Sequence, residues 1–127
     1  MLAGTRARSR RRGAALVEAA VVLPVFLLLV VGGVVLGLGI FRYQEIAHLA
    51  RESARWASLQ DASLRTKGQI LTNVLTPKAV GVDPAAIGVA TTSTADSTTV
   101  TLSYAWTPEA YLPSITFTCK AQVRNPY

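Results

Sequence analysis

An apolar run over residues 14–40 constrains the fold more than any other feature of this sequence. It reads AALVEAAVVLPVFLLLVVGGVVLGLGI, and Glu18 is its only charged residue. As a helix rising ~1.5 Å per residue, the run is roughly 40 Å long, which exceeds the ~30 Å hydrocarbon core of a bilayer. The run therefore predicts a single transmembrane helix.

Positive charge is concentrated in front of this run. The net charge is +6, and the five arginines of residues 1–13, a segment without acidic residues, account for five of these charges. Basic residues that flank a span favour the cytoplasmic side, so we expect the N-terminus inside and the chain after residue 40 outside. Nucleic-acid binding is not expected, because the charge is crowded in one short tail rather than spread over a folded surface.

The run also has two ordinary explanations, and each meets a difficulty. A secretory signal has an apolar region of about 7 to 15 residues before its cleavage site, and this run is longer. A plain anchor gives no reason for Glu18, since a carboxylate deep in a span costs roughly 2.5 to 3.5 kcal/mol, although near the helix end it reaches the interface. Glu18 therefore needs a compensating partner.

Residues 10–58 combine several features that occur together in one family. Basic residues precede Gly13, Glu18 follows five positions later, and an Ala-Val-Val-Leu-Pro step ends at Pro24. A segment rich in Ala and Arg follows the span. In these features the sequence resembles the TadE-like proteins, minor pilins or pseudopilins of the tight-adherence (Tad, Flp-type) pilus system. Ala19 departs from the aromatic residue that related pilins carry after the glutamate, which argues against a major pilin.

The resemblance implies a processing site and an assembly residue. A prepilin peptidase would cut on the cytoplasmic side between Gly13 and Ala14, so that Glu18 becomes the fifth residue of the mature chain. Glu18 would then pair with the free amine of Ala14 on a neighbouring subunit, because an ammonium and a carboxylate attract strongly where water is scarce. The implied partners are the membrane, the prepilin peptidase, other Tad pilins and the inner-membrane assembly platform.

Each of these residues also has a simpler interpretation. Gly13 would be a flexible residue between a basic tail and a helix, and Glu18 an interfacial carboxylate near the arginines. Pro24 predicts a helix kink, because proline lacks an N–H donor and frees the carbonyl of Ala20. The kink either only bends the helix or lets subunits pack around a filament axis, and the sequence does not separate these alternatives.

Residues 41–60 are expected to continue the helix outside the membrane. A narrow stripe of apolar residues recurs there at helical spacing, while most charged residues lie elsewhere around the helix. The stripe consists of Ile46, Ala50, Ala54 and Ala57. Its small side chains would let a sheet or a partner helix come close. His48 is the only histidine and has no cysteine near it, so metal binding is not expected.

The segment after this helix predicts a second, weaker helix. Residues 63–75 place apolar side chains on one helical face, but Gly68 costs about 1 kcal/mol relative to alanine in a helix interior. Pro77 is expected to end the helix. The following residues 81–88 contain an Asp-Pro turn signal and would form a connection.

The last third of the chain has strand character. Residues 89–94 and 98–106 alternate apolar and polar side chains or are rich in threonine, and a turn at residues 95–97 would join them into a hairpin. A final strand over residues 115–124 alternates strictly, so that one face is expected to be buried and the other wet. Cys119 lies on the apolar face and is expected to be a small buried side chain, with an intermolecular disulfide as the alternative.

The predicted fold class is α+β and type IV pilin-like. A long N-terminal helix, half transmembrane and half exported, would carry a small antiparallel β-sheet domain packed on its exported half. The expected parts are a cleaved basic leader (1–13), a transmembrane helix (14–40), its exported continuation (41–60) and a small exported domain (61–127).

The residue types that act in catalysis or bind metals in other proteins are scarce in this sequence. The sequence contains one histidine, one cysteine and no P-loop or GxGxxG motif. We therefore expect no enzyme activity, no cofactor, no metal and no small-molecule substrate. The main hypothesis is a minor pilin or pseudopilin that takes part in Tad pilus assembly and thereby in adhesion, biofilm formation, secretion or DNA uptake. The alternatives are an uncleaved single-pass anchor that presents a small binding or scaffolding domain, and an exported domain released by cleavage beyond Gly39.

Overall fold

The computed structural model describes residues 6–108 and 112–126 of the chain. The chain divides into two compact units, Met1–Gly37 and Leu38–Tyr127. We refer to the second unit as the C-terminal domain.

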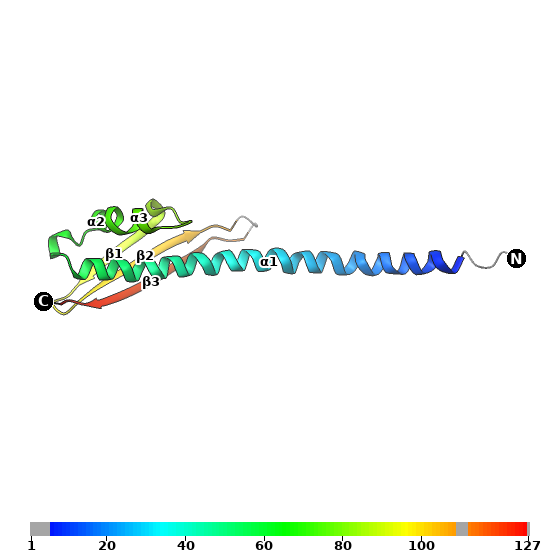
Figure 1. Cartoon of the computed structure of the whole chain (residues 1–127), viewed down its shortest axis with the longest axis horizontal. Coiled ribbons are helices and arrows are strands. Elements are labelled where there is room, and N and C mark those ends of the chain that lie inside the picture. Colours follow the sequence, from blue (N-terminus) through cyan, green and yellow to red (C-terminus); the bar gives the residue numbers. More distant parts are fainter. Residues whose placement is uncertain (1–5, 109–111, 127) are drawn as a thin grey trace. The chain divides into compact units, whose positions relative to one another are not determined.

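One long helix, several short helical segments and three strands follow one another along the chain (Figure 1). The long helix α1 spans Arg6–Ser58 and runs through the boundary between the two units. The short segments are η1 (Ala62–Leu64), α2 (Lys67–Ile70), η2 (Leu71–Leu75), α3 (Thr76–Lys78) and η3 (Pro84–Ala86). The strands are β1 (Ile87–Ser93), β2 (Ser97–Trp106) and β3 (Ile115–Arg124).

The helix α1 begins earlier and ends slightly earlier than the apolar pattern predicts. It includes the arginine-rich residues from Arg6 onward, because arginine is a good helix former and no proline lies among residues 6–13. It ends at Ser58, whose hydroxyl donates a hydrogen bond to the carbonyl of Arg55 at 2.8 Å. Two further backbone bonds, from Leu59 and Gln60, close the last turn.

The predicted alanine stripe of α1 forms the helical side of the domain core. Its four members and the intervening Leu49 are at most 1 % exposed: Ile46 0 %, Leu49 0 %, Ala50 1 %, Ala54 0 % and Ala57 0 %. Positions four residues apart lie one above the other on a helix, which is why these residues share one face. This part of the sequence-based prediction is confirmed.

The three strands form one antiparallel sheet in the order β1-β2-β3. The predicted hairpin is confirmed, and its turn is closed by the amide of Thr94, which donates to the carbonyl of Ser97 at 2.8 Å. In the central strand, alternate residues are buried, and Leu102 pairs with Val89 on one side and with Cys119 on the other.

The predicted alternation of β3 holds, but its apolar face is only partly buried. Cys119 is buried, whereas Phe117 and Ala121 are partly exposed and Ile115 is 43 % exposed. The reason is position, because β3 is an edge strand and has a neighbour on one side only.

The segment 62–78 differs from the single helix predicted for residues 63–75. It contains a 3₁₀ turn and then three short helical segments in succession, one of them a π-helix. The hydroxyl of Thr66 caps the first of these by accepting a hydrogen bond from the amide of Gln69 at 3.4 Å. Pro77 does not end the helix, because it occupies the first turn of α3, where a missing N–H is tolerated.

Polar contacts fix this segment to α1 within the domain. The carboxylate of Glu45 accepts a hydrogen bond from the amide of Val80 at 3.0 Å, and Glu52 pairs with Lys78. The hydrogen bond and charge of Lys78 lower the pKa of the Glu52 carboxyl. Because both side chains are substantially exposed, water and salt screen this pair and it contributes little to stability.

The C-terminal domain is therefore the C-terminal part of α1 with a small three-stranded antiparallel sheet packed on it. This is the α+β fold class that the sequence predicts.

Candidate functional site: the N-terminal part of α1 and the surface of the C-terminal domain

The predicted processing site lies inside α1. Gly13 and Ala14 are helical and exposed. Beyond its neighbours and the adjacent helix backbone, a Cβ atom added at Gly13 would meet no atom of the described residues within 4 Å. The fold around this site therefore does not require glycine.

The predicted assembly residue, Glu18, is exposed on the same helix. Ala14 and Glu18 are four residues apart, so they lie on one face of α1 and one turn apart, at about 6 Å along the axis. The structure thus brings the nitrogen of the proposed new N-terminus and the carboxylate to the same side of the helix.

Pro24 lies within α1, which continues as a helix through it. The proline removes one backbone hydrogen bond, so the carbonyl of Ala20 has no helical donor. The predicted helix kink at this position stays a prediction.

In the first unit, large apolar side chains are exposed along α1. Examples are Leu16 at 70 %, Phe26 at 57 % and Leu36 at 70 % exposed. The residues Gly13–Ser58 contain a stretch that is long and apolar enough to cross a membrane. This agrees with a single-pass membrane protein, because an apolar surface of this size is costly in water.

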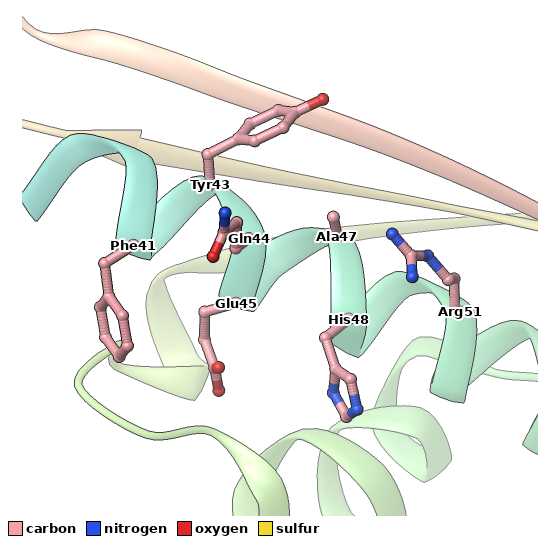
Figure 2. A pocket seen from close by; sticks show the side chains of 7 residues that line it. All are labelled: Phe41, Tyr43, Gln44, Glu45, Ala47, His48 and Arg51. Carbon is pink, nitrogen blue, oxygen red and sulfur yellow. The ribbon is translucent and has the colours of Figure 1, made fainter. Parts of the chain in front are cut away.

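An open depression of about 530 Å³ lies along α1 in the domain (Figure 2). It is lined by Phe41, Tyr43, Gln44, Glu45, Ala47, His48 and Arg51. Figure 2 shows Phe41, Glu45 and His48 on one side of the helix, and Tyr43 and Ala47 on the other. Because one helix supplies all its residues and the depression is open, it has no enclosed space for a small molecule.

His48 is exposed, as expected for a solvated side chain. Within residues 6–108 and 112–126, no group of three or more His, Cys, Asp or Glu side chains is placed to hold a metal ion.

Two side-chain clusters in the domain have no counterpart in the sequence-based predictions. The first is a polar cluster around Arg65, which donates to the carbonyl of Gln60 at 2.9 Å and to the hydroxyl of Thr98 at 3.1 Å. The same hydroxyl donates to the side chain of Asn125 at 2.7 Å. These residues come from three separate parts of the sequence, so no local pattern indicates their contact.

The second cluster is aromatic and lies near the start of the domain. The rings of Trp106 and Phe117 are stacked with centroids 6.0 Å apart, and Tyr43 meets Phe117 edge-on at 5.9 Å. Trp106 also covers Gly39, where an added Cβ atom would lie 2.8 Å from Cζ3 of the indole. Gly39 is therefore needed for the close approach of α1 and β2.

Cys119 is a free thiol and is 7 % exposed, so the predicted buried side chain is confirmed. Burial raises the pKa of the Cys119 thiol, and the thiolate is the reactive form. We expect this thiol to react slowly with a maleimide in the folded protein and rapidly after unfolding in guanidinium chloride.

Thr118→Cys combined with Cys119→Ala provides the matched control, because residue 118 is the exposed neighbour on the opposite face of β3. The control thiol should react rapidly in the folded protein. Equal rates for the two thiols, or a disulfide-linked dimer of the unaltered chain, would contradict burial of Cys119.

These features define a class of protein: an α+β domain carried by a helix that is able to cross a membrane once. The family model described as TadE-like protein matches residues 13–55, so the resemblance seen in the sequence is confirmed for this part of the chain. The match begins at Gly13 and includes Ala14, Glu18 and Pro24. No curated protein and no solved structure matches the chain significantly.

Proposed function

We propose that the protein is a minor pilin or pseudopilin of a Tad pilus system. In this proposal a prepilin peptidase cuts after Gly13, and the mature chain begins with Ala14. The chain then takes part in pilus assembly at the cytoplasmic membrane, with its C-terminal domain on the outer side. The observation that carries the proposal is the family match, which starts at the glycine of the proposed cleavage site.

The position of Glu18 supports a role in assembly. Cleavage after Gly13 creates a new amine on Ala14, one helical turn from Glu18 on the same face. In a membrane, a carboxylate and an ammonium group both lose their hydration, and pairing the two charges offsets part of that cost. Glu18 therefore favours a neighbouring subunit that supplies an ammonium group. The amine of an adjacent subunit fills this role when subunits are staggered along their helices.

The helical state of Gly13 bears on cleavage. A protease needs the peptide bond in an open conformation, whereas α1 runs through Gly13 without interruption. Glycine weakens a helix by about 1 kcal/mol relative to alanine, which lowers the free energy needed to open the helix at this point. In the proposed mechanism the peptidase binds this locally opened form.

The intact mass and N-terminal sequence of the protein test the proposal directly. The protein is purified from cells that contain the matching prepilin peptidase and from cells that lack it. We expect a chain beginning Ala14-Ala15-Leu16 only when the peptidase is present. Retention of the arginines in both strains would contradict processing.

The second candidate is an uncleaved single-pass anchor that presents the C-terminal domain as a binding or scaffolding module. The observation that favours it is the unbroken helix across Gly13 and Ala14, since an uncut chain needs no opening there. The same experiment separates the two candidates, because an anchor keeps its leader in both strains.

Replacement of Glu18 tests the assembly role. We expect Glu18→Gln to insert and to be cleaved normally, but to enter pili poorly, because glutamine keeps the shape and removes the charge. Removing one partner of a buried ion pair costs about 3 to 5 kcal/mol, so incorporation into sheared pili should fall by more than about tenfold. Quantitative immunoblots of pili and of membranes measure the effect.

Val17→Ala is the control for this experiment. Val17 is the adjacent residue, 68 % exposed and uncharged, so its replacement should leave incorporation unchanged. Normal incorporation of Glu18→Gln would exclude the amine-pairing role. Equal losses in both variants would show that incorporation depends on the general packing of this helix.

A further inference from the structure

Most of the large apolar side chains that are exposed in the C-terminal domain lie toward one end. Five of them surround the first turns of α1 in the domain, and we call this surface the base: Phe41, Tyr43, Val80, Leu112 and Ile115. Their exposed fractions range from 43 % for Ile115 to 64 % for Val80. After Tyr43, the described part of the domain has two other large apolar side chains that are exposed by 42 % or more, Leu59 and Leu64. Both follow the opposite end of the helix.

Contacts within the domain place the base residues at one level. Ile115 is paired with Trp106, which covers Gly39, and Leu112 precedes it in the connection between β2 and β3. Val80 is adjacent to Gly81, whose carbonyl accepts a hydrogen bond from Arg42 at 2.6 Å. The end of the sheet and the connection before η3 therefore both meet α1 within residues 39–45.

An aromatic cluster of the C-terminal domain adjoins the base. Trp106, Phe117 and Tyr43 are in ring contact, and the guanidinium of Arg42 lies 6.0 Å from the centre of the Trp106 ring. Arg42 also approaches the hydroxyl of Tyr104 at 3.5 Å. Tryptophan, tyrosine and arginine side chains combine an apolar body with a polar tip, and this is the composition that proteins place at the boundary between lipid and water.

We propose that the base is a membrane-docking surface, which rests in the boundary between headgroups and acyl chains of the bilayer that α1 crosses. The inference rests on the membrane span of the proposed function. Its first support is continuity along the chain, since α1 is one helix through residues 37–43 and Leu38 and Ile40 are also exposed. Along the sequence, the apolar residues of the span therefore continue to Phe41 and Tyr43 with Arg42 as the only intervening polar residue.

The arrangement around α1 favours lipid over a protein partner. Phe41 and Tyr43 lie on opposite sides of the helix (Figure 2). Val80 is near the Phe41 side, because a Cβ atom on Gly81 would lie 3.7 Å from the Phe41 ring, and the sheet end is on the Tyr43 side. A bilayer surrounds a spanning helix on every side, whereas one protein partner covers a single side.

Docking of the base determines the height of the domain above the bilayer before assembly. Contact on two sides of α1 also restricts tilting of the domain against the membrane plane. During extraction of the chain from the membrane, these side chains leave the lipid together with the end of the span.

Nitroxide labels on single cysteines test the docking in the full-length protein. The labels replace Ile115, Val80, Leu64 and Val30 one at a time in a Cys119→Ala background. Each labelled protein is placed in vesicles of phosphatidylethanolamine and phosphatidylglycerol. The measurement is the collision rate with oxygen, which concentrates in lipid, relative to a water-soluble nickel chelate. We expect Ile115→Cys and Val80→Cys to show a higher oxygen-to-nickel ratio than Leu64→Cys and a lower one than Val30→Cys.

The controls separate the docking from the span. If Val30→Cys is exposed to water, both the span and the docking are wrong. If Val30→Cys lies in lipid but Ile115→Cys and Val80→Cys match Leu64→Cys, the span stands and the docking is wrong. Shielding of the base labels from both reagents, or lipid contact on one side of α1 only, would indicate a protein partner and also overturn the docking.

A second measurement avoids the Cys119→Ala background. In a Trp56→Phe variant, Trp106 is the only tryptophan, and lipids brominated near the headgroup should quench its fluorescence. Quenching no stronger than that by lipids brominated at the chain ends would contradict an interfacial position.

Discussion

Gly13→Val is expected to leave the protein at its precursor mass in cells that contain the prepilin peptidase. The added side chain meets no atom of the chain within 4 Å of its Cβ, so the fold and the membrane insertion should be unaffected. The substitution instead places a branched side chain at the residue that the peptidase must accept, and it removes the weak point of the helix. We expect processing to slow by at least about tenfold, which is about 1.4 kcal/mol in the transition state.

Gly32→Val is the matched control, because Gly32 lies in the same helix and has equally open surroundings. Pulse-chase labelling followed by mass spectrometry measures the fraction of mature chain for both variants. Rapid processing of Gly13→Val would contradict the proposed cleavage site. Slow processing of Gly32→Val as well would point to a general effect of valine on the helix.

Leu102→Ala is expected to destabilise the C-terminal domain by about 2 to 5 kcal/mol. Leu102 is fully buried in the central strand, with paired residues on both neighbouring strands, so its removal leaves a cavity in the middle of the core. Small domains have a total stability of only about 5 to 15 kcal/mol, so much of the stability is lost. Guanidinium unfolding of the full-length protein in detergent micelles, followed by near-ultraviolet circular dichroism, measures the change.

Leu59→Ala removes the same atoms from a side chain that is 65 % exposed. This control should change the free energy of unfolding by no more than about 0.5 kcal/mol. Similar losses from both variants would mean that the core is not centred on β2.

Regular patterns in the sequence were sufficient to predict the main elements of the domain. The apolar stripe of α1 and the alternation in β2 both reflect one buried face, and a buried face repeats with the period of its element. The turn around Asp96 followed from short polar residues between two strands. These are local signals, and the structure confirms them.

The connection between α1 and the sheet was not predictable in the same way. Its helical type changes three times within residues 62–78, since short helices depend on tertiary contacts more than on propensity. The position of Pro77 shows the difficulty, because proline ends one helix but also begins another.

The contacts at the two ends of the domain, between residues far apart in the sequence, could also not be predicted. Gly39 is one of several glycines in an apolar run, and only its position under Trp106 distinguishes it. Likewise, Arg65 and Asn125 both contact Thr98, which is far from each of them in the sequence. For the candidate site the situation is the reverse, because Gly13, Glu18 and Pro24 were recognised from sequence spacing, and the structure adds their helical state and their exposure.

The position of β3 in the sheet has a consequence for the order of folding. Cys119 and Phe117, which complete the core and the aromatic cluster, lie in β3, the last of the three strands in sequence order, and Asn125 follows β3 and joins the polar cluster. A partly synthesised chain that lacks these residues leaves one edge of β2 unpaired and one side of the core open. The domain can therefore close only after β3 and Asn125 have been synthesised. Until then, the unpaired edge of β2 is a surface on which a chaperone or a second growing chain competes with β3.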